Sequence, residues 1–344
     1  MIKIKTPQKS NLKGMKFIDL FAGIGGFHLA LSSFDTECAF VSEWDKHAQS
    51  VYEQNFGIRP FGDITLIDEK EIPSHDILCG GFPCQAFSIS GKQRGFEDSR
   101  GTLFFDIARI AKHHKPKILL LENVYNLERH DNGNTLKVIK KTLKQLGYNI
   151  FYKVLNASHF GIPQIRKRIF FVCFRNDLGV SAFQFPKPTK TNTRLNDFLE
   201  KEVEDFVFPS KERLKKLSLK DEKLNQLSLQ LDLKDKFVSS IRVGTINKGG
   251  QGERIYSPYG TSITLSAYGG GVGSKTGLYL INGKIRKLSP RECANVTGFP
   301  KDFILHENKN QSYKQYGNSV VVDVVQNILI QINATLNEDN LINY

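Results

Sequence analysis

The sequence predicts an α/β protein with a large domain on a mostly parallel sheet and a second, smaller domain of loops and β strands. Three observations favour this fold class. In the first half of the chain, short apolar runs alternate with amphipathic stretches, as in repeated βαβ units. Several of these runs are apolar on both faces, which is typical of strands covered by helices on each side. Farther on, glycines separated by β-branched and aromatic residues indicate a smaller β lobe.

The elements of the large domain follow in order from this pattern. The predicted strands are 16–21, 38–42, 76–79, 118–121, 150–155 and 169–174. The predicted helices between the first five strands are 27–33, 47–55, 102–114 and 134–146. Strands that alternate with helices, and that present a ligand crevice at their carboxyl ends, form a Rossmann-like arrangement.

The chain changes character after residues 185–188, where the alternation stops. Segment 201–236 carries nine Lys or Arg and eight Asp or Glu, a net charge of +1. Its sequence is repetitive and rich in leucine, which predicts a solvated helix pair or a variable insertion. Helical spacing returns near the end of the chain, in a segment that we expect to fold back on the large domain. We therefore expect a large domain at 1–195, a smaller domain at 196–289, a hinge at 290–317 and a returning C-terminal helix at 318–344.

Charge and cysteine content narrow the classes of function. The net charge of +13 favours a polyanionic partner, although a merely basic housekeeping protein fits it about equally well. The five scattered cysteines fit neither a disulfide framework nor a structural zinc site, so we expect free thiols and no metal. No run reaches the roughly 20 apolar residues of a membrane span, and residues 1–14 lack the apolar middle of a signal peptide. We therefore expect a cytoplasmic protein without a membrane partner.

Residues 17–26 form a strand, a glycine turn and the start of a helix, an arrangement that lets the backbone approach an adenosine-type ligand. Glu43 ends the next strand, where a carboxylate can take both hydroxyls of a ribose. Trp44, the only tryptophan, follows it and can stack on adenine. The turn lacks the third glycine of the dinucleotide fingerprint, and no Walker lysine follows it. A nucleoside without phosphates fits better, and S-adenosylmethionine is the common one.

Cys84 stands on a Gly-Gly-Phe-Pro-Cys loop after the third predicted strand, where its thiol would face the ligand crevice. A cysteine is more often a small buried hydrophobe, and that interpretation suits Cys38, Cys79 and Cys173. Cys84 differs from these three because a proline and two glycines place it on a loop. A thiolate there is a candidate nucleophile.

Glu122 ends a fully apolar strand, where a carboxylate is costly unless it has a function or a partner. Burial favours the protonated form of such a carboxyl, which could then act as an acid, although a salt-bridged structural Glu is the alternative. Arg166 and Arg168 precede the sixth predicted strand. They form either a solvated basic turn or a site for a phosphate and a substrate carbonyl.

Six motifs, in this order, resemble those of the DNA cytosine-C5 methyltransferases. They are Phe21-x-Gly23-x-Gly25-Gly26, Pro83-Cys84-Gln85, Glu122-Asn123-Val124, Gln164-x-Arg166-x-Arg168, Arg291-Glu292-Cys293-Ala294 and Gly317-Asn318-Ser319-Val320. Each motif alone is weak, but six in order across nearly the whole chain are highly specific. Segments 82–101 and 248–257 resemble the branch of this family that methylates GCGC, whereas 196–235 departs from it.

This resemblance implies a large S-adenosylmethionine-dependent methyltransferase domain and a smaller target-recognition domain. The implied catalytic residues are Cys84, Glu122, Arg166 and Arg168, with Arg168 on the O2 side of the base. The implied cofactor residues are Phe21, Gly23, Gly25, Glu43, Trp44, Asp63, Ile64, Pro83, Asn318 and Ser319. The implied DNA-binding residues are Ser88, Ser90, Lys92 and Arg100 in a closing loop, and Gln251 and Arg254 at the bases.

The chemistry expected of this set starts from the weak nucleophilicity of cytosine C5. Addition of the Cys84 thiolate at C6 would activate the ring, Glu122 would assist at N3, and the methyl transfer would leave S-adenosylhomocysteine as the product. Because C6 is inaccessible in a stacked duplex, the base must be flipped out. We expect duplex DNA as the partner, a monomer in a bacterial cytoplasm with its activity on the nucleoid, and a cognate restriction endonuclease as a functional partner.

Three other functions fit parts of the sequence. An RNA cytosine-C5 methyltransferase would share the first domain, but the developed second domain with Gln251 and Arg254 favours duplex DNA. A catalytically silent DNA-binding regulator would not need both Cys84 and Glu122. A nicotinamide or flavin oxidoreductase would leave the thiol and the order of the motifs unexplained. Methyl incorporation from labelled S-adenosylmethionine would separate all three from the expected enzyme.

Overall fold

The computed structural model describes residues 10–82, 103–189, 192–203, 218–219 and 239–338. These residues form two compact units. The larger unit holds 10–82, 103–155, 167–186 and 325–338, and the smaller unit holds 156–166 and the described residues from 187 to 324. Each unit has its own sheet.

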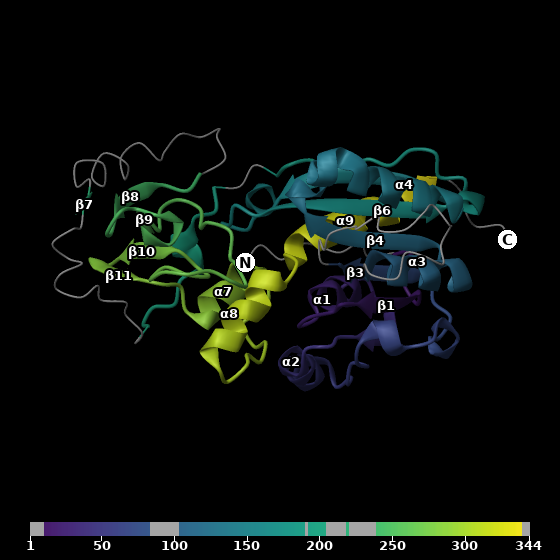
Figure 1. Cartoon of the computed structure of the whole chain (residues 1–344), viewed down its shortest axis with the longest axis horizontal. Coiled ribbons are helices and arrows are strands. Elements are labelled where there is room, and N and C mark those ends of the chain that lie inside the picture. Colours follow the sequence, from purple (N-terminus) through teal and green to yellow (C-terminus); the bar gives the residue numbers. More distant parts are fainter. Residues whose placement is uncertain (1–9, 83–102, 190–191, 204–217, 220–238, 339–344) are drawn as a thin grey trace. The chain divides into compact units, whose positions relative to one another are not determined.

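The larger unit is built on a six-stranded sheet with the order β2-β1-β3-β4-β6-β5 (Figure 1). Its strands are β1 (Lys16–Leu20), β2 (Glu37–Ser42), β3 (Ile77–Gly81), β4 (Ile118–Val124), β5 (Tyr148–Asn156) and β6 (Lys167–Arg175). β1 pairs in parallel with both β2 and β3, and β3 pairs in parallel with β4. The predicted α/β class and all six predicted strands are confirmed, with ends that differ by at most three residues.

One end of this sheet departs from the parallel pattern, because β6 runs antiparallel to β4. Parallel neighbours need a crossover, usually a helix, whereas β5 and β6 are joined only by residues 157–166. The sequence carries no helical pattern in that connection. β6 therefore enters the sheet from β5 without the helical crossover that joins the earlier strands.

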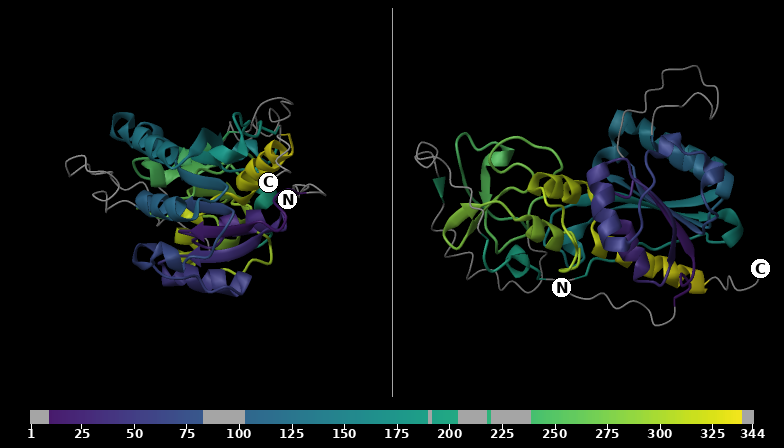
Figure 2. Two further views of the ribbon diagram at one scale, coloured as in Figure 1. Left: turned by 90° about the vertical axis from the view of Figure 1, so that its right-hand side faces the viewer. Right: turned by 90° about the horizontal axis from the view of Figure 1, so that it is seen from below.

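Helices cover both faces of the larger sheet. They are α1 (Gly26–Ser32), α2 (Lys46–Phe56), α3 (Leu103–His114), α4 (Asn134–Gln145) and α9 (Val322–Glu338). Alternate strand residues such as Ile18 and Leu20 pack with α3 and α4 in one core cluster. Phe17, on the other face of β1, meets His28 of α1 edge to face. The right-hand view of Figure 2 shows α3 and α9 on opposite sides of the sheet.

The C-terminal helix α9 is apolar because it is a core helix of this fold. Residues 309–336 have the length and mean hydropathy of a membrane span, but 61% of their most apolar window is buried inside the protein. Val325, Ile328 and Ile332 are fully buried. At the far end of α9, Asn333 accepts a hydrogen bond from the backbone N–H of Asn11 at 2.7 Å. From Val325 onward, α9 therefore packs within the larger unit.

The smaller unit carries a five-stranded sheet with the order β11-β10-β9-β8-β7. Its strands are β7 (Ser218–Leu219), β8 (Arg242–Thr245), β9 (Arg254–Tyr256), β10 (Leu278–Ile281) and β11 (Lys284–Arg286), and its helices are α7 (Pro290–Asn295) and α8 (Lys309–Asn318). β10 and β11 form a hairpin around Asn282 and Gly283, which both have positive φ, as an Asn-Gly turn requires. A small core of Val243, Ile246, Ile255, Leu278 and Ile285 holds this sheet together.

The units divide the chain differently from the boundaries expected from the sequence. Residues 156–166 and 187–195 group with the smaller unit, as does the expected hinge at 290–317. Hydrogen bonds explain the first of these assignments. Ser262 donates its backbone N–H to Pro163 at 2.7 Å, and Ile165 donates to Ser262 at 2.9 Å. The connection between β5 and β6 is therefore hydrogen-bonded to a segment almost 100 residues later in the chain.

Candidate active site and recognition turn

A glycine turn and the carboxylate of Glu43 lie together at the carboxyl ends of β1 and β2. Glu43 is buried, and its Oε2 accepts the backbone N–H of Gly23 at 2.7 Å, while its Oε1 accepts that of Asp45 at 2.8 Å. Burial raises the pKa of Glu43, and the hydrogen bonds from Asp45 and Gly23 oppose the rise. Each carboxylate oxygen has a second lone pair, so Glu43 can still accept two hydroxyl groups. This geometry fits the predicted ribose contact.

The backbone of the turn depends on glycine at the position where a ligand would approach. Gly25 has φ +88°, and a Cβ there would lie 2.3 Å from the ring of Phe56. On the adjacent strand β3, a Cβ at Gly80 would lie 2.9 Å from the carbonyl oxygen of Leu20. The Phe21 ring would be 3.6 Å from that Cβ, so it lies over the backbone of Gly80. A side chain at either glycine would collide with these neighbouring atoms.

The residues predicted to meet the adenine differ in how they are placed. Trp44 is 75% exposed, which is unusual for the largest apolar side chain and leaves its ring accessible for stacking. Asp63 caps a short helix by accepting the backbone N–H of Thr65 at 3.0 Å. The Ile64 side chain is buried in the core, and its carbonyl accepts a hydrogen bond from Arg109 at 2.6 Å. Contacts of Asp63 and Ile64 with a ligand stay predictions.

Trp44→Ala should weaken binding of S-adenosylhomocysteine by about 10-fold or more, since the loss of an aromatic stacking partner costs about 1 to 3 kcal/mol per base. Isothermal titration calorimetry of the variant and the native protein measures this change. Tyr259→Ala removes an exposed aromatic ring from the smaller unit and serves as the matched control. Equal affinities for native protein and Trp44→Ala would rule out stacking at this position.

A buried carboxyl group, missed by the sequence analysis, lies in the middle of β1. Asp19 is fully buried, and burial raises its pKa well above the ordinary range. Neither carboxylate oxygen has a hydrogen-bond partner among the described residues, and the charge of Glu43 adds to the rise. Asp19 therefore holds a proton in the folded protein under conditions where an exposed Asp is ionised.

Asp19→Asn should gain stability relative to the native protein as the pH rises. The unfolded chain releases the Asp19 proton above about pH 3.9, whereas the folded chain keeps it to a higher pH, so the native free energy of unfolding falls across that window. The amide does not titrate, and the difference between the two proteins should widen from pH 5 to pH 8. Thermal unfolding midpoints at several pH values test this, with the exposed Asp35→Asn as control. A difference that is constant with pH would contradict the assignment.

Glu122 and Arg168 meet at the carboxyl end of β4. The Arg168 Nε lies 3.0 Å from Glu122 Oε1, and both side chains are mostly buried. Gly81 of β3 permits this position, because a Cβ there would come within 3.3 Å of Glu122 Oε2. The structure thus brings together two of the four predicted catalytic residues, from neighbouring antiparallel strands.

Asn123 links this pair to the start of the predicted nucleophile loop. Its side-chain N–H donates to the carbonyl of Phe82 at 2.8 Å, and its Oδ1 accepts the backbone N–H of Val124 at 2.8 Å. Asn123 is almost fully buried. It fixes the end of β3 directly before the Pro-Cys motif, a function that a motif match alone does not reveal.

The described cysteines are poor candidates for a nucleophile. Cys38, Cys79, Cys173 and Cys293 are free thiols, and burial raises the pKa of each, that of Cys38 to about 12. A thiol with a raised pKa is protonated near neutral pH and unreactive. Cys84 lies outside the described residues, as do Pro83, Ser88, Ser90, Lys92 and Arg100. Their predicted functions stay predictions.

Arg166 is placed differently from Arg168. It is buried in the smaller unit, where its guanidinium donates to the carbonyl oxygens of Leu265 at 3.1 Å, Gly317 at 2.9 Å and Ser319 at 2.6 Å. These contacts give Arg166 a structural function that joins three segments, and a direct contact with substrate stays a prediction. Ser319 is nearly buried at the end of α8, while Asn318 is exposed.

A braced turn in the smaller unit carries the two residues predicted to read bases. Gln251 begins a 3-10 helix that runs to Glu253, and Arg254 begins β9. Glu253 braces this turn by accepting hydrogen bonds from Asn247 at 2.7 Å and from the backbone of Gly250 at 3.1 Å. The buried Nε of Arg254 has no hydrogen-bond partner among the residues described. A buried donor without a partner costs free energy in the folded protein.

Metal ligands do not cluster in the part of the chain that the structure describes, where no group of three His, Cys, Asp or Glu side chains could hold an ion. The carboxylates of the site, Glu43 and Glu122, instead hold backbone N–H groups and a guanidinium. Their geometry fits hydrogen bonding to an organic ligand.

Comparisons with known proteins extend over almost the full chain. A family model described as C-5 cytosine-specific DNA methylase matches residues 15–334. The type II methyltransferase M.HhaI of Haemophilus parahaemolyticus is 56% identical over 339 residues, which are 98% of this chain and 99% of the relative. M.SsoII of Shigella sonnei is 43% identical over 96% of this chain and 83% of its own length. The solved structure of a mutant DNMT2 of Spodoptera frugiperda is similar to this chain, with a TM-score of 0.67 at 21% identity. The match covers 94% of this chain and all of the DNMT2 chain, and it shows the fold alone.

Proposed function

The chain belongs to the C-5 cytosine-specific DNA methylases and methylates cytosine in DNA, and from this premise we propose a reaction path, a target sequence and a function for each site residue. The observation that carries the proposal is the Glu122–Arg168 pair beside the strand end that Asn123 fixes. It places an acid and a cation next to the chain that enters the Pro-Cys motif. The membership in a DNA methylase family, over both units, disfavours the RNA enzyme, the silent regulator and the oxidoreductase.

The reaction begins at the flipped cytosine, when the thiolate of Cys84 adds to C6. The new carbon–sulfur bond pushes the ring electrons toward N3, where protonated Glu122 donates a proton or a hydrogen bond. C5, now nucleophilic, takes a methyl group. A base then removes the C5 proton, and the returning electrons break the bond from C6 to Cys84. The thiolate is restored, N3 returns its proton to the Glu122 carboxylate, and the product base carries a methyl group at C5.

Arg168 has two functions in this proposal. In the structure its guanidinium holds Glu122 in place, and with cytosine bound it supports the O2 side of the ring. Because Arg168 lies on β6 and Glu122 on β4, the sheet itself sets the separation of the two side chains. This is an advantage for catalysis, since residues on strands hold their geometry more closely than residues on loops.

S-adenosylmethionine supplies an electrophilic methyl group as a sulfonium when it is bound, and the family as a whole uses this donor. Glu43 would hold its ribose, Trp44 and Phe21 its adenine, and the backbone around Gly23 and Gly25 would allow its approach. The unused lone pairs of Glu43 and the exposed ring of Trp44 support this assignment.

We propose GCGC as the target, with methylation of the inner cytosine. Segment 248–257 carries the resemblance to the GCGC branch, and the partly exposed Arg254 follows the turn that Glu253 braces. An Arg that binds guanine through two hydrogen bonds contributes about 1 to 3 kcal/mol of discrimination. Gln251 would fill the space that the flipped base leaves.

Bisulfite sequencing of a plasmid from expressing cells tests this target. The expected result is protection of the inner cytosine at every GCGC, and Arg254→Ala should relax or abolish the preference at one guanine. Protection at another sequence would leave the DNA methylase in place and remove the proposed target. An absence of protected cytosine in any sequence would instead count against the reaction path.

The remaining features of the proposal concern the cell. We propose a monomer that acts on the nucleoid in a bacterial cytoplasm, as the modification enzyme of a type II restriction system. The names of both relatives support a type II system. A restriction endonuclease would then share its target without a stable complex.

A further inference from the structure

Helix α4 of the larger unit carries a row of four lysines on one side. They are Lys137, Lys140, Lys141 and Lys144, and we call this row the lysine face. Steps of three and four positions place these residues on the same side of a helix, and all four are exposed. The other side of α4 holds Ile139 and Leu143, which are fully buried in the core. The lysine face therefore points away from the sheet, and Figure 1 shows α4 on the outside of the larger unit.

The charge of the lysine face is not balanced by acids of the same elements. Neither α4 nor strand β5, which follows it, contains an Asp or Glu, and β5 adds the exposed Lys153. The nearest acids along the chain are Glu128 and Asp131, in the turns that precede α4. The Lys140 amino group lies 5.1 Å from the centre of the Tyr152 ring on β5, a contact that leaves its positive charge in place.

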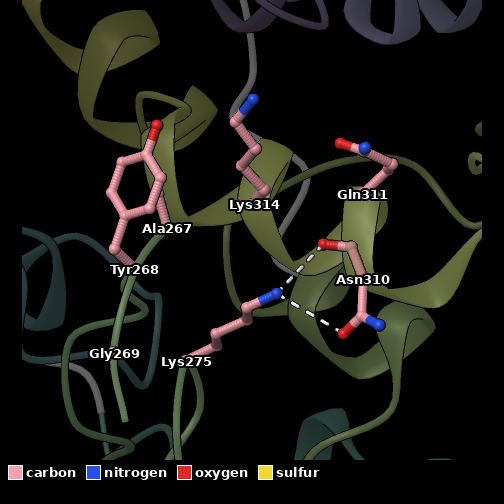
Figure 3. Close-up of a pocket in the computed structure, with 7 residues that line it drawn as sticks. All are labelled: Ala267, Tyr268, Gly269, Lys275, Asn310, Gln311 and Lys314. Carbon is pink, nitrogen blue, oxygen red and sulfur yellow. Dashed lines mark hydrogen bonds between the residues drawn. The ribbon is translucent and has the colours of Figure 1, made fainter.

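Two lysines elsewhere in the protein show how such a charge is otherwise held. Lys117 pairs with Asp76 at 3.0 Å. At a pocket of about 270 Å³ in the smaller unit, Lys275 donates to the carbonyl oxygen of Asn310 at 3.3 Å and to its side-chain oxygen at 3.5 Å (Figure 3). No ion pair or hydrogen bond to another described residue holds a lysine of the α4 row. Their amino groups are therefore available to a ligand.

The row is unfavourable for the helix itself. Lys137 and Lys141 are like charges four positions apart, as are Lys140 and Lys144, and such pairs destabilise a helix. Glutamine has nearly the same helix propensity as lysine and carries no charge, so the helix does not need lysine at these positions. An anion bound along the row would relieve the repulsion, because it places negative charge between the ammonium groups.

The composition of the lysine face fits a phosphate backbone better than a protein or a membrane. Protein interfaces are poor in lysine and rich in aromatic side chains, methionine and arginine. A helix that binds a membrane inserts its apolar side, whereas the apolar side of α4 is buried in the protein. The row is about 10 Å long at 1.5 Å per residue. A DNA strand presents one phosphate about every 3.4 Å along its axis, so the row spans about three phosphates.

We propose that the lysine face binds a second segment of duplex DNA, separate from the segment that presents the target cytosine. The Glu122–Arg168 pair lies at the carboxyl end of β4, whereas the lysine face lies on the outer side of a helix that covers a face of the sheet. The proposal rests on DNA as the substrate. It adds a contact without sequence preference, which would keep the enzyme on long DNA while the target segment is exchanged.

The number of short duplexes bound per protein tests this proposal. Sedimentation velocity at low salt, with an excess of a duplex of about 12 base pairs, roughly 40 Å long, should show two copies on the native protein. The triple variant Lys137→Gln/Lys141→Gln/Lys144→Gln should bind one copy. For the native protein, the log affinity of the second copy should fall with log salt at a slope of about −3, as expected for three phosphate contacts.

Two further variants separate this site from a general effect of charge. Lys13→Gln/Lys70→Gln/Lys301→Gln removes the same number of exposed lysines from three other segments and should still bind two copies. Arginine in place of the same three α4 lysines keeps the charge of the row and should also bind two copies. The single-turnover rate on the short duplex should be native in the glutamine variant, because the target segment does not touch the lysine face.

Three results would overturn the proposal. One copy on the native protein at low salt, or two copies on the glutamine variant, would exclude a second duplex at the lysine face. A slower single-turnover rate in the glutamine variant would place these lysines on the target segment instead. Cosedimentation with phosphatidylserine vesicles that only the glutamine variant loses, with equal duplex counts for both proteins, would assign the lysine face to a membrane. Because the duplex count needs neither turnover nor a particular sequence, failure of the reaction path or of the GCGC target would not change it.

Discussion

Cys84→Ser should lower the single-turnover rate of methyl transfer by about 10⁴-fold or more, the scale on which loss of a catalytic nucleophile acts. A serine hydroxyl is far less acidic and less nucleophilic than a thiol, so addition at C6 should almost stop. Base flipping and DNA binding precede that step, and the variant should retain both. Rapid-quench measurement with labelled S-adenosylmethionine and a gel-shift titration give the two quantities.

DNA that contains 5-fluorocytosine gives a second readout for Cys84. Fluorine cannot leave as the C5 proton does, so the enzyme should remain covalently attached to the base and survive denaturing electrophoresis. Cys38→Ser is the matched control, because burial raises the pKa of Cys38 to about 12 and its loss should leave the adduct unchanged. An adduct in the Cys84→Ser variant would show that another group attacks the base.

Glu122→Gln should slow the chemical step by about 10² or more, the usual contribution of an acid or base. The amide keeps the size of the side chain and can donate a weak hydrogen bond, but it cannot deliver a proton to N3. It also loses the charge that pairs with Arg168 at 3.0 Å. Single-turnover rates at saturating DNA isolate the chemical step.

The contribution of the ion pair must be separated from that of the acid. Arg168→Lys retains a positive charge near Glu122 but loses the planar fork of the guanidinium. If the single-turnover rate falls only in Glu122→Gln, the result would indicate acid catalysis by Glu122. Cofactor affinity should be native in both variants, because Glu43 and Trp44 lie on a different strand end. An unchanged single-turnover rate for Glu122→Gln would refute its proposed function.

Local pattern was enough to predict the sheet and helices of the larger unit. Its strands are buried on both faces and bounded by turns, so runs such as 118–121 have one reasonable interpretation. The direction of β6 was harder to predict, because it depends on where the chain re-enters the sheet and not on the apolar run itself.

Residues whose function depends on distant partners escaped prediction. Arg166 looks like part of a basic turn in the sequence, yet its acceptors lie 99 to 153 positions later. For Gly317, the sequence indicates a motif, but only the packing on Ala267 shows why a side chain is excluded there.

The division of the chain also restricts how target specificity can be exchanged between relatives. The described chain crosses between the two units at residues 155/156, 166/167, 186/187 and 324/325. A graft of 187–324 alone would bring new hydrogen-bond partners for Pro163, Ile165 and Arg166. Segment 156–166, which holds these three residues, would still come from the recipient protein. A working chimera needs both pieces from one parent, so 156–166 should be inherited together with the recognition region although the two are separate in the gene.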